Sequence, residues 1–592
     1  MKKIFLFFIF LLITGCIEGS SSNNTDSLNN NIDKKKSYFS IKKGEEFSYV
    51  ILDKDFYIKN PPKGMAAFPN GEITWTPTND QEGSYDINIY KGNSLISTIH
   101  INVSGQDIKY DGYFVDLNSD AHGDGSPEQP FNRISSACKT IKKNNYSKLN
   151  VYLRGGIYKN ENFGQSLDNS VMEFIKGCNG TIGKYINIRP WGNERVLILS
   201  DGFSAFAIRE SSYLTIKNLE FKGIADKIKF EEALDYWWNS KRYYKGSGIS
   251  INKECHDIVI QKNVIHDFPG AGIAVHNSDG IKIENNIVYN NAWWTVAGTG
   301  GAVLTQSKEL TDSESYIKGN LLFDNESRIF SHVFQKGFSH LVIDEGEALL
   351  VQEGKDTEGN SYISSYNKHY HILDNFLAFN GKGIVVNKAD KAFVKNNSLY
   401  LSNSLRVGSY SSDVYIQQNA VQVKDNGKWV SIARNDTKRI YVRNNFYNRS
   451  ATAKYDTTNP DIYLEDNIPV NKVFEDPSKF KLVNQVKIAK VGASTEQWDI
   501  LEGMLKKYDI TITPTGWDYS EEKMIFMKKK IIEDAKNLGP DVIIDCSQLN
   551  ENPSKVIIKN IPESFVKKNR LPSPSFELIL EYPYDGEKCD IL

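Results

Sequence analysis

A short apolar run that ends in asparagine recurs along the middle of the chain and constrains its fold more than any other feature. Typical segments are DIVIQKNVIHD, GIKIENNIVYNN and YHILDNFLAFN, in which apolar and polar residues alternate over about five positions. The asparagines that align are Asn218, Asn263, Asn286, Asn320, Asn375, Asn397, Asn419 and Asn445. A spacing of 22 residues recurs, with longer steps where insertions interrupt the pattern.

This spacing suits one coil of a parallel β-solenoid, whereas helical repeats of about 33 residues or more are longer. Alternation predicts strands with one buried face, and apolar residues at helical spacing are missing. Asparagine beside a strand favours a turn, and stacked asparagines can hydrogen-bond as a ladder. The pattern predicts a mainly β chain with a right-handed parallel β-helix over residues 110–450. Its motifs resemble those of the pectate-lyase-like superfamily.

The N-terminus has the features of an exported lipoprotein. Residues 1–16 read MKKIFLFFIFLLITGC, two lysines and an apolar run too short to span a membrane. Residues 13–16 match the bacterial lipobox, which implies cleavage before Cys16 and lipid attachment to its thiol; the alternative is an ordinary signal peptide with a chance cysteine. Ile17 stands where an inner-membrane retention signal has Asp, so in a Gram-negative host the resemblance implies the outer membrane. We expect a lipid-anchored cell-envelope protein.

Residues 17–36 are polar and are expected to form a flexible tether. Strand-like runs separated by Gly, Pro and Asn then predict a small β domain over residues 37–105. Its GEITWTPT and GSY motifs resemble the Ig-like modules of bacterial surface proteins. The resemblance implies an Ig-like β-sandwich, with Trp75 and Tyr85 in its core, that acts as a spacer.

Both ends of the predicted β-helix carry additional segments. Residues 135–142 are expected to form a short helix that covers the open end of the first coil. Residues 480–592 are assigned to a small α/β or cap region, with a helix at 521–537. Cys546 and Cys589 can pair in an oxidising compartment, and the sequence leaves this open.

Composition and motifs exclude several function classes. The formal charge is −2, so there is no basic excess that would suggest a nucleic-acid partner. The chain has no G-x-S-x-G, Walker or dinucleotide-binding motif. His256, His266 and His276 recur at intervals that do not match the coil, so they are not expected to converge on zinc.

Counting from the ladder asparagines predicts which side chains stack, because equivalent positions in successive coils lie about 4.8 Å apart. One column contains Asp267, Asn290 and Asp324, and the next contains Asn291, Asn325 and Asn380. A third contains Trp294 and Arg328, which predicts that these two line one glycan groove. The alternative is that Trp294 packs under a loop and Arg328 is a solvated surface charge.

The repeat breaks at residues 326–355, where titratable residues accumulate. His332 or Lys336 is the predicted catalytic base, and Arg328 the predicted partner of a substrate carboxylate. Asp344, Glu345 and Glu347 are predicted ligands of Ca²⁺, which prefers several oxygen ligands. The alternative is a solvated charged loop.

The leading functional hypothesis is a polysaccharide lyase acting on acidic, uronic-acid-containing glycans. The β-helix resemblance carries much of it, and a fold does not fix a function. Flat aromatic side chains suit sugar rings, so the predicted substrate-binding residues are Trp237, Trp238, Trp293 and Trp294. The loop that carries Trp237 and Trp238 is either a packed flap or a sugar platform. The alternative function is a non-catalytic surface lipoprotein, an adhesin that binds glycan or protein.

Overall fold

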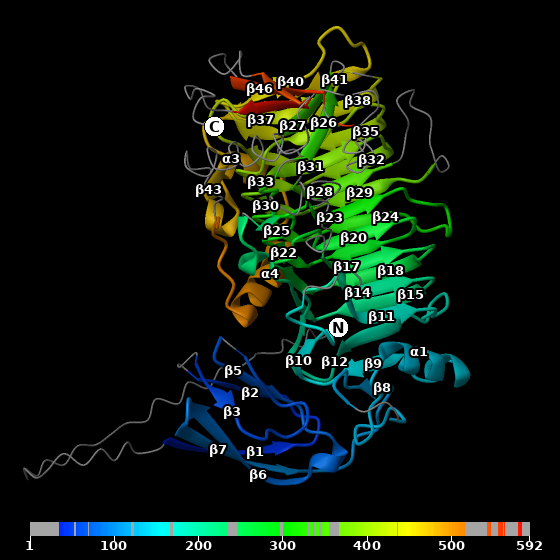
Figure 1. The fold of residues 1–592 in the computed structure, drawn as a ribbon, viewed down its shortest axis with the longest axis vertical. Coiled ribbons are helices and arrows are strands. Elements are labelled where there is room, and N and C mark those ends of the chain that lie inside the picture. The colour runs from blue at the N-terminus through cyan, green and yellow to red at the C-terminus, as the bar shows by residue number, and fades with distance from the viewer. Residues whose placement is uncertain are drawn as a thin grey trace, which may run out of the picture.

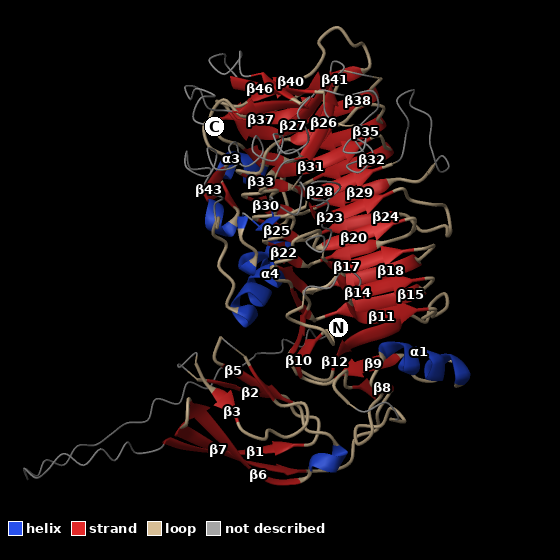
Figure 2. Ribbon diagram, in the orientation of Figure 1, coloured by secondary structure: helices blue, strands red, loops and turns tan. Residues whose placement is uncertain are grey.

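The computed structural model describes residues 35–51, 55–68, 70–119, 123–165, 170–230, 232–233, 246–295, 300–329, 331–335, 338–342, 346–353, 366–434, 436–515, 542–545, 554–560, 562 and 578–582. Strands dominate these residues, and a tall stack of coils stands on a smaller β module (Figures 1 and 2). No helix in the described part of the chain is long and apolar enough to cross a membrane.

Three parallel sheets form the walls of the stack, and each complete coil contributes one strand to each wall. The 12-stranded sheet contains β8 (Gly112–Val115), β9 (Asn150–Leu153), β12 (Ile186–Pro190), β15 (Ser212–Lys217), β18 (His256–Gln261), β21 (Lys282–Glu284), β24 (Ser315–Lys318), β29 (Tyr370–Leu373), β32 (Asp390–Lys395), β35 (Ser412–Gln417), β38 (Lys438–Arg443) and β41 (Ile462–Glu465). The 11-stranded sheet contains β10 (Gly156–Lys159), β13 (Val196–Leu199), β16 (Glu220–Lys222), β19 (Val264–His266), β22 (Ile287–Tyr289), β25 (Leu321–Phe323), β30 (Phe376–Ala378), β33 (Ser398–Tyr400), β36 (Ala420–Gln422), β39 (Phe446–Asn448) and β42 (Ile468–Val470).

The 10-stranded sheet contains β11 (Val171–Lys176), β14 (Ser204–Arg209), β17 (Ser247–Asn252), β20 (Ile273–His276), β23 (Gly300–Thr305), β28 (Glu347–Gln352), β31 (Lys382–Asn387), β34 (Leu405–Val407), β37 (Lys428–Ile432) and β40 (Thr452–Lys454). The architecture confirms the predicted parallel β-helix. The solenoid continues to Val470 at the end of β42, beyond the predicted limit of residue 450.

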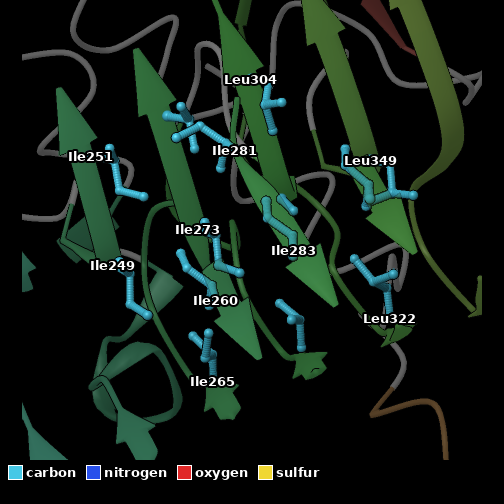
Figure 3. Packing of buried hydrophobic residues seen from close by; sticks show 14 of the residues in the cluster. Ile249, Ile251, Ile260, Ile265, Ile273, Ile281, Ile283, Leu304, Leu322 and Leu349 are labelled. Carbon is cyan, nitrogen blue, oxygen red and sulfur yellow. The ribbon is translucent and has the colours of Figure 1, made fainter. Parts of the chain in front are cut away.

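Stacked aliphatic side chains fill the interior of the solenoid (Figure 3). Ile260 of β18 lies in register with Ile283 of β21, which in turn lies in register with Ile317 of β24. All three are buried, and burying such a side chain stabilises the fold by about 1.5–3 kcal/mol. β-Branched residues suit this pleated surface, which explains why the sequence repeat is rich in isoleucine and valine.

A ladder of asparagines, all buried except the half-buried Asn467 at its end, runs along the turn between the 12-stranded and 11-stranded sheets. Its members are Asn263, Asn286, Asn320, Asn375, Asn397, Asn419, Asn445 and Asn467, each amide donating to the next side-chain oxygen at 2.8–3.1 Å. A second ladder joins Asn291, Asn325 and Asn380, which confirms that predicted column. These bonds satisfy polar groups that would otherwise be buried without partners.

Asn218 is not a member of the ladder, which corrects the predicted alignment by one residue. Asn263 Oδ1 accepts a hydrogen bond from the backbone N–H of Leu219, the equivalent position in that coil. Asn218 is exposed with φ of 59°, like the left-handed Asn285 that precedes Asn286. Asparagine tolerates both turn positions, so the sequence pattern alone confuses them.

We expect Asn286→Leu to destabilise the solenoid by about 1–3 kcal/mol, because neighbouring buried polar groups lose their partners. Asn286 Oδ1 accepts from Asn263, and Asn286 Nδ2 donates to Asn320 and to the carbonyl of Ile260. Chemical denaturation measures the change, with Asn218→Leu as the matched control at an exposed turn position. Equal effects of the two substitutions would contradict the ladder's role.

Helix α1 (Ile134–Lys143) packs at the first coil, as predicted. Ile134, Ala137, Cys138 and Ile141 form its buried stripe at helical spacing. A disulfide joins Cys138 to Cys178, which follows β11, so the helix is also linked covalently to the solenoid. The sequence analysis did not predict this disulfide.

The N-terminal module consists of two small sheets around Trp75. One contains β1 (Lys35–Lys42), β7 (Ser94–Ser104), β6 (Gly83–Lys91) and β3 (Tyr57–Ile58), and the other β2 (Phe47–Val50), β5 (Glu72–Trp75) and β4 (Ala66–Ala67). A short 3₁₀ helix, η1 (Asn79–Gln81), precedes β6. Trp75 and Tyr85 pack edge to face, with Trp75 fully buried, so the predicted core position of Trp75 is confirmed.

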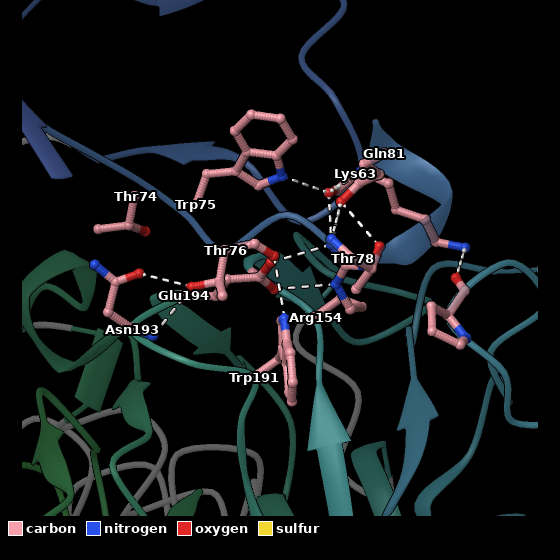
Figure 4. Close-up of polar contacts among 12 residues, drawn as sticks. Lys63, Thr74, Trp75, Thr76, Thr78, Gln81, Arg154, Trp191, Asn193 and Glu194 are labelled. Atoms are coloured by element: carbon pink, nitrogen blue, oxygen red, sulfur yellow. Dashed lines mark hydrogen bonds and ion pairs between the residues drawn. The ribbon is translucent and has the colours of Figure 1, made fainter. Parts of the chain in front are cut away.

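The module is joined to the first coil by buried polar contacts (Figure 4). Arg154, at the end of β9, pairs with Glu194 at 3.0 Å and donates to the carbonyl of Lys63 at 2.6 Å. Gly64 has φ of 82°, and a Cβ there would lie 2.2 Å from Arg154 Nη2. The close fit shows that the module is docked on the first coil; its predicted role as a spacer stays a prediction.

The described parts of residues 471–592 pack back on the solenoid. β43 (Phe474–Asp476), η4 (Pro477–Lys479) and β44 (Lys481–Leu482) lead into α3 (Asn484–Ile488) and α4 (Thr495–Tyr508), whose apolar residues cover the outer side of the 11-stranded sheet. β45 (Ile543–Asp545), β46 (Ser554–Lys559) and β47 (Leu578–Tyr582) form a sheet with β26 (Ser331–Gln335) and β27 (Phe338–Val342). β27 pairs with β47, so the segment that breaks the repeat meets the C-terminal region.

Candidate functional site

The predicted groove of Trp294 and Arg328 is absent, because these side chains are buried. Trp293 is 6% exposed and Trp294 2% exposed, and Trp294 Nε1 donates to the carbonyl of Ala225 at 2.9 Å. The Arg328 guanidinium lies over Trp293, 3.4 Å from the ring centroid. The backbone N–H of Arg328 also donates to the carbonyl of Trp293. The backbone register therefore matches the predicted column, but both side chains pack inside the structure.

Asp324 belongs to the same interior cluster. Burial raises the pKa of its carboxyl to about 6, although Thr515 donates a hydrogen bond to it. Arg328 Nη2 lies 3.7 Å from Asp324 and its Nε donates to Glu326 at 3.0 Å. Arg328 therefore interacts with protein carboxylates, which competes with the predicted contact to a substrate carboxylate.

Most of the other predicted site residues lie in parts of the chain that the structure does not describe. Trp237, Trp238, Lys336, Asp344, Glu345 and Cys16 lie outside the described residues, as do Cys546 and Cys589. His332 lies on β26, for which the structure describes the strand alone. These assignments stay predictions.

Glu347, at the start of β28, is the one predicted calcium ligand that is described. It is buried, and its Oε1 lies 3.1 Å from the ammonium of Lys382 on the neighbouring strand β31. Within the described ranges no three His, Cys, Asp or Glu side chains gather as metal ligands. Asp344 and Glu345 lie outside the described residues, so the predicted calcium site stays a prediction, and we derive no step through it.

A basic cavity lies on the outer face of the 10-stranded sheet in the last coils. Its volume is about 850 Å³. The lining comprises Gly381, Lys382, Asn403, Ser404, Arg406, Lys428, Ser431, Ile432, Ala433, Arg434 and Lys454. We call this set the basic cavity. Five of its side chains are cationic, and none is a carboxylate or an imidazole.

The strand register explains how these cations meet. Val385 of β31 lies beside Arg406 of β34, then Ser431 of β37 and Lys454 of β40. Earlier coils fill the same outward column with Val303 and Leu350, which are buried. The outer face therefore changes from apolar to basic along the solenoid, and Arg406 and Lys454 flank Ser431 in this column, two coils or about 9.6 Å apart.

Cations at this spacing create a positive potential that attracts polyanions. Two unit charges about 10 Å apart interact by about 1–2 kcal/mol at an effective dielectric constant of about 20, and salt screens exposed charges. Lysine and arginine also donate directly to carboxylates, with arginine suited to bidentate contacts. The cavity can therefore hold an acidic, extended ligand.

A second polar cluster lies on the outer side of the 11-stranded sheet, at the end of α4. His266 Nδ1 contacts Asp267 at 2.9 Å, and its Nε2 lies 3.5 Å from Glu220. Glu220 pairs with Arg195 at 2.7 Å, and that guanidinium lies over the ring of Tyr508. The cluster is buried, so its arrangement indicates a structural role.

The charges of this cluster predict a loss of stability in alkaline solution. Burial alone lowers the pKa of His266, but Asp267 and Glu220 outweigh it and raise the pKa to about 9, above the ordinary 6.5. The stabilisation is fully present below pH 6.5 and is lost as the pH rises through 9, by about 3 kcal/mol. Denaturation midpoints at both ends of this range measure it, with His266→Gln as the control. If the denaturation midpoints of the parent protein and the variant changed equally between the two pH values, the assignment to His266 would be contradicted.

Comparison with known proteins supports the fold. The family model described as "Right handed beta helix region" matches residues 155–339. No curated protein matches the chain.

Solved structures with a similar chain path include a rhamnogalacturonan lyase, at 14% identity and TM-score 0.33, covering 64% of this chain and 99% of that one. The A-module of a mannuronan C-5 epimerase from Azotobacter vinelandii has 14% identity and TM-score 0.31, and the match covers 60% of this chain and 95% of that one. A lacto-N-biosidase from Eubacterium ramulus has 15% identity and TM-score 0.28, and the match covers 60% of this chain and 68% of that one. At these TM-scores the likenesses carry no argument about activity.

Proposed function

We propose that the basic cavity binds an acidic polysaccharide and that the protein acts on it as a polysaccharide lyase for uronic-acid-containing glycans. The observation that carries the proposal is the gathering of five cationic side chains, from consecutive coils, around one cavity without a carboxylate in its lining. One of the five, Lys382, also pairs with the buried carboxylate of Glu347. Such a lining attracts carboxylates and would repel a cationic ligand. Sugar residues in a chain can present carboxylates repeatedly, as the cavity presents cations.

The chemistry of β-elimination suits a cationic site. A cation paired with the uronate carboxylate makes the C5 proton more acidic, and a base then removes it. The C5 electron pair forms the C4–C5 double bond while the C4–O bond breaks, and the leaving oxygen takes a proton. Arg406 and Lys428 are suited to pairing the carboxylate, and Lys336 or His332 stays the predicted base.

Incubation with polygalacturonate, alginate and glucuronan tests this function, followed by the absorbance of the unsaturated product. We expect absorbance to rise with at least one polymer, and its dependence on a chelator tests the predicted calcium ion. Binding to the polymers without any such rise would overturn the lyase proposal.

The second candidate is a non-catalytic surface lipoprotein that binds acidic glycans. It is favoured by the described lining of the cavity, which offers no carboxylate or imidazole as a general base. The same assay separates the two, because an adhesin binds the polymer and leaves its length unchanged.

We propose further that a lipid on Cys16 anchors the protein in the cell envelope, at the outer membrane of a Gram-negative host. The lipobox supports this, as does the disulfide between Cys138 and Cys178, a bond typical of proteins outside the cytosol. We expect Cys16→Ser to block processing or release the protein from membranes in detergent partitioning. A mature, membrane-bound variant would contradict the anchor.

A further inference from the structure

The four-stranded sheet of the N-terminal module has an open polar face. Alternate residues of β7, such as Ile99, Ile101 and Val103, point into the module's core, so their neighbours point outward. β1, β6 and β7 lie on the side of the module away from the solenoid (Figure 1). The outer face is therefore separate from the contacts that dock the module.

Two rows of side chains cross this face and form a shallow groove. Tyr38, His100 and Asp86 share one register row and form a raised wall. The adjacent row has the smaller residues Ser40, Asn102 and Ser84, which form a floor beside it. The hollow lined by these rows has a volume of about 370 Å³, within the range of small-ligand sites.

The wall is ordered by contacts between its own members. The Tyr38 ring stacks on the His100 ring with centroids 4.5 Å apart, and His100 Nδ1 lies 2.5 Å from Asp86 Oδ1. Tyr38 is nevertheless 71% exposed, which is unusual for so large a ring. A pre-ordered and exposed aromatic side chain loses little conformational freedom when a ligand packs against it.

The floor supplies hydrogen-bonding groups of both kinds. Ser84 donates to Asn102 Oδ1 at 3.0 Å, and a hydroxyl or amide of this kind can both donate and accept. A ligand that carries many hydroxyls on a ring with apolar faces matches this combination of polar floor and aromatic wall. Pyranose sugars have that chemistry.

We propose that this groove binds an uncharged polysaccharide, so that the module is a second glycan-binding site. Its lining includes the carboxylate of Asp86 and no lysine or arginine, so it disfavours uronate chains. The two sites thus have opposite electrostatic character, and they lie at opposite ends of the molecule, with the basic cavity in the last coils (Figure 1). This inference does not depend on the lyase proposal.

Affinity electrophoresis of the full-length protein tests the groove, in gels that contain xylan, mixed-linkage β-glucan or polygalacturonate. The variant Tyr38→Ala with Asn102→Ala removes the wall ring and the floor amide. Tyr57→Ala is the matched control, because Tyr57 is also an exposed tyrosine, 46% exposed, on β3 of the same sheet but outside the groove. Circular dichroism checks that the variants are folded.

We expect a neutral polymer to retard the parent protein, and the groove variant to bind that polymer at least tenfold more weakly. Tyr57→Ala and Arg406→Glu keep this retardation, whereas Arg406→Glu loses retardation by polygalacturonate. Absence of retardation by both neutral polymers would overturn the inference, as would unchanged retardation of a folded groove variant. Neither result bears on the basic cavity, which the acidic polymer tests separately.

Discussion

We expect Arg154→Met to lower the free energy of unfolding at the junction of module and solenoid by about 3–5 kcal/mol. Arg154 and Glu194 are both fully buried, and Arg154 Nε and Nη2 donate to the two Glu194 oxygens at 3.1 and 3.0 Å. Without the guanidinium, the Glu194 carboxylate is buried without a compensating charge, and the carbonyl of Lys63 loses its 2.6 Å hydrogen bond. Removing one partner of an ion pair lowers the free energy of unfolding most when the remaining charge is fully buried, as it is here.

Chemical denaturation followed by tryptophan fluorescence measures the loss, since Trp75 and Trp191 lie at this junction (Figure 4). The double variant Arg154→Met with Glu194→Leu recovers much of it, because no charge is then left buried. Arg439→Met is the matched control, since Arg439 pairs with Asp413 at 2.6 Å on the surface, where such pairs contribute about 0–1 kcal/mol. Equal losses at Arg154 and Arg439 would contradict the role assigned to burial.

The repeat made the fold predictable from the sequence. Each coil repeats the same physical pattern, so errors at one coil are averaged out by the others. The exception at Asn218 is instructive, because the turn has two adjacent positions that both suit asparagine. A single coil cannot distinguish them, but its neighbours place the inward position at Leu219.

The candidate site was not predictable in the same way. The predicted columns gave the register, as Asn325 and Asn380 show, but the register does not say whether a side chain is exposed, and Trp294 is buried. The cations of the basic cavity lie on the third sheet, farthest along the coil from the preceding ladder asparagine. Aligning Arg406 with Lys454 directly, strand by strand, would have found the basic column.

Long-range contacts of single residues were also beyond the sequence. Cys138 and Cys178 are 40 residues apart and carry no motif that pairs them. Docking of the module depends on Arg154, which in the sequence is simply a charged residue that follows a strand. A buried position can be recognised for isoleucine, but an arginine at such a position looks like any surface charge.

Reversing two charges of the basic cavity should weaken binding of acidic polysaccharide at least tenfold. Arg406→Glu with Lys454→Glu places two carboxylates in the outward column on either side of Ser431. Each substitution removes an attraction and adds a repulsion, and neighbouring charges a few ångströms apart interact by kilocalories per mole in this environment. Affinity electrophoresis or calorimetry with polygalacturonate at low salt measures the change.

The matched control is Lys479→Glu with Lys487→Glu, because it changes the net charge equally. Both lysines are exposed on η4 and α3, which lie on the flank of the 11-stranded sheet and outside the cavity. If local charge in the cavity holds the ligand, the control binds like the parent protein. At about 1 M salt, where the Debye length falls to about 3 Å, all three proteins should bind weakly and alike. Equal weakening by both double variants at low salt would instead assign the effect to net charge and remove the cavity as the binding site.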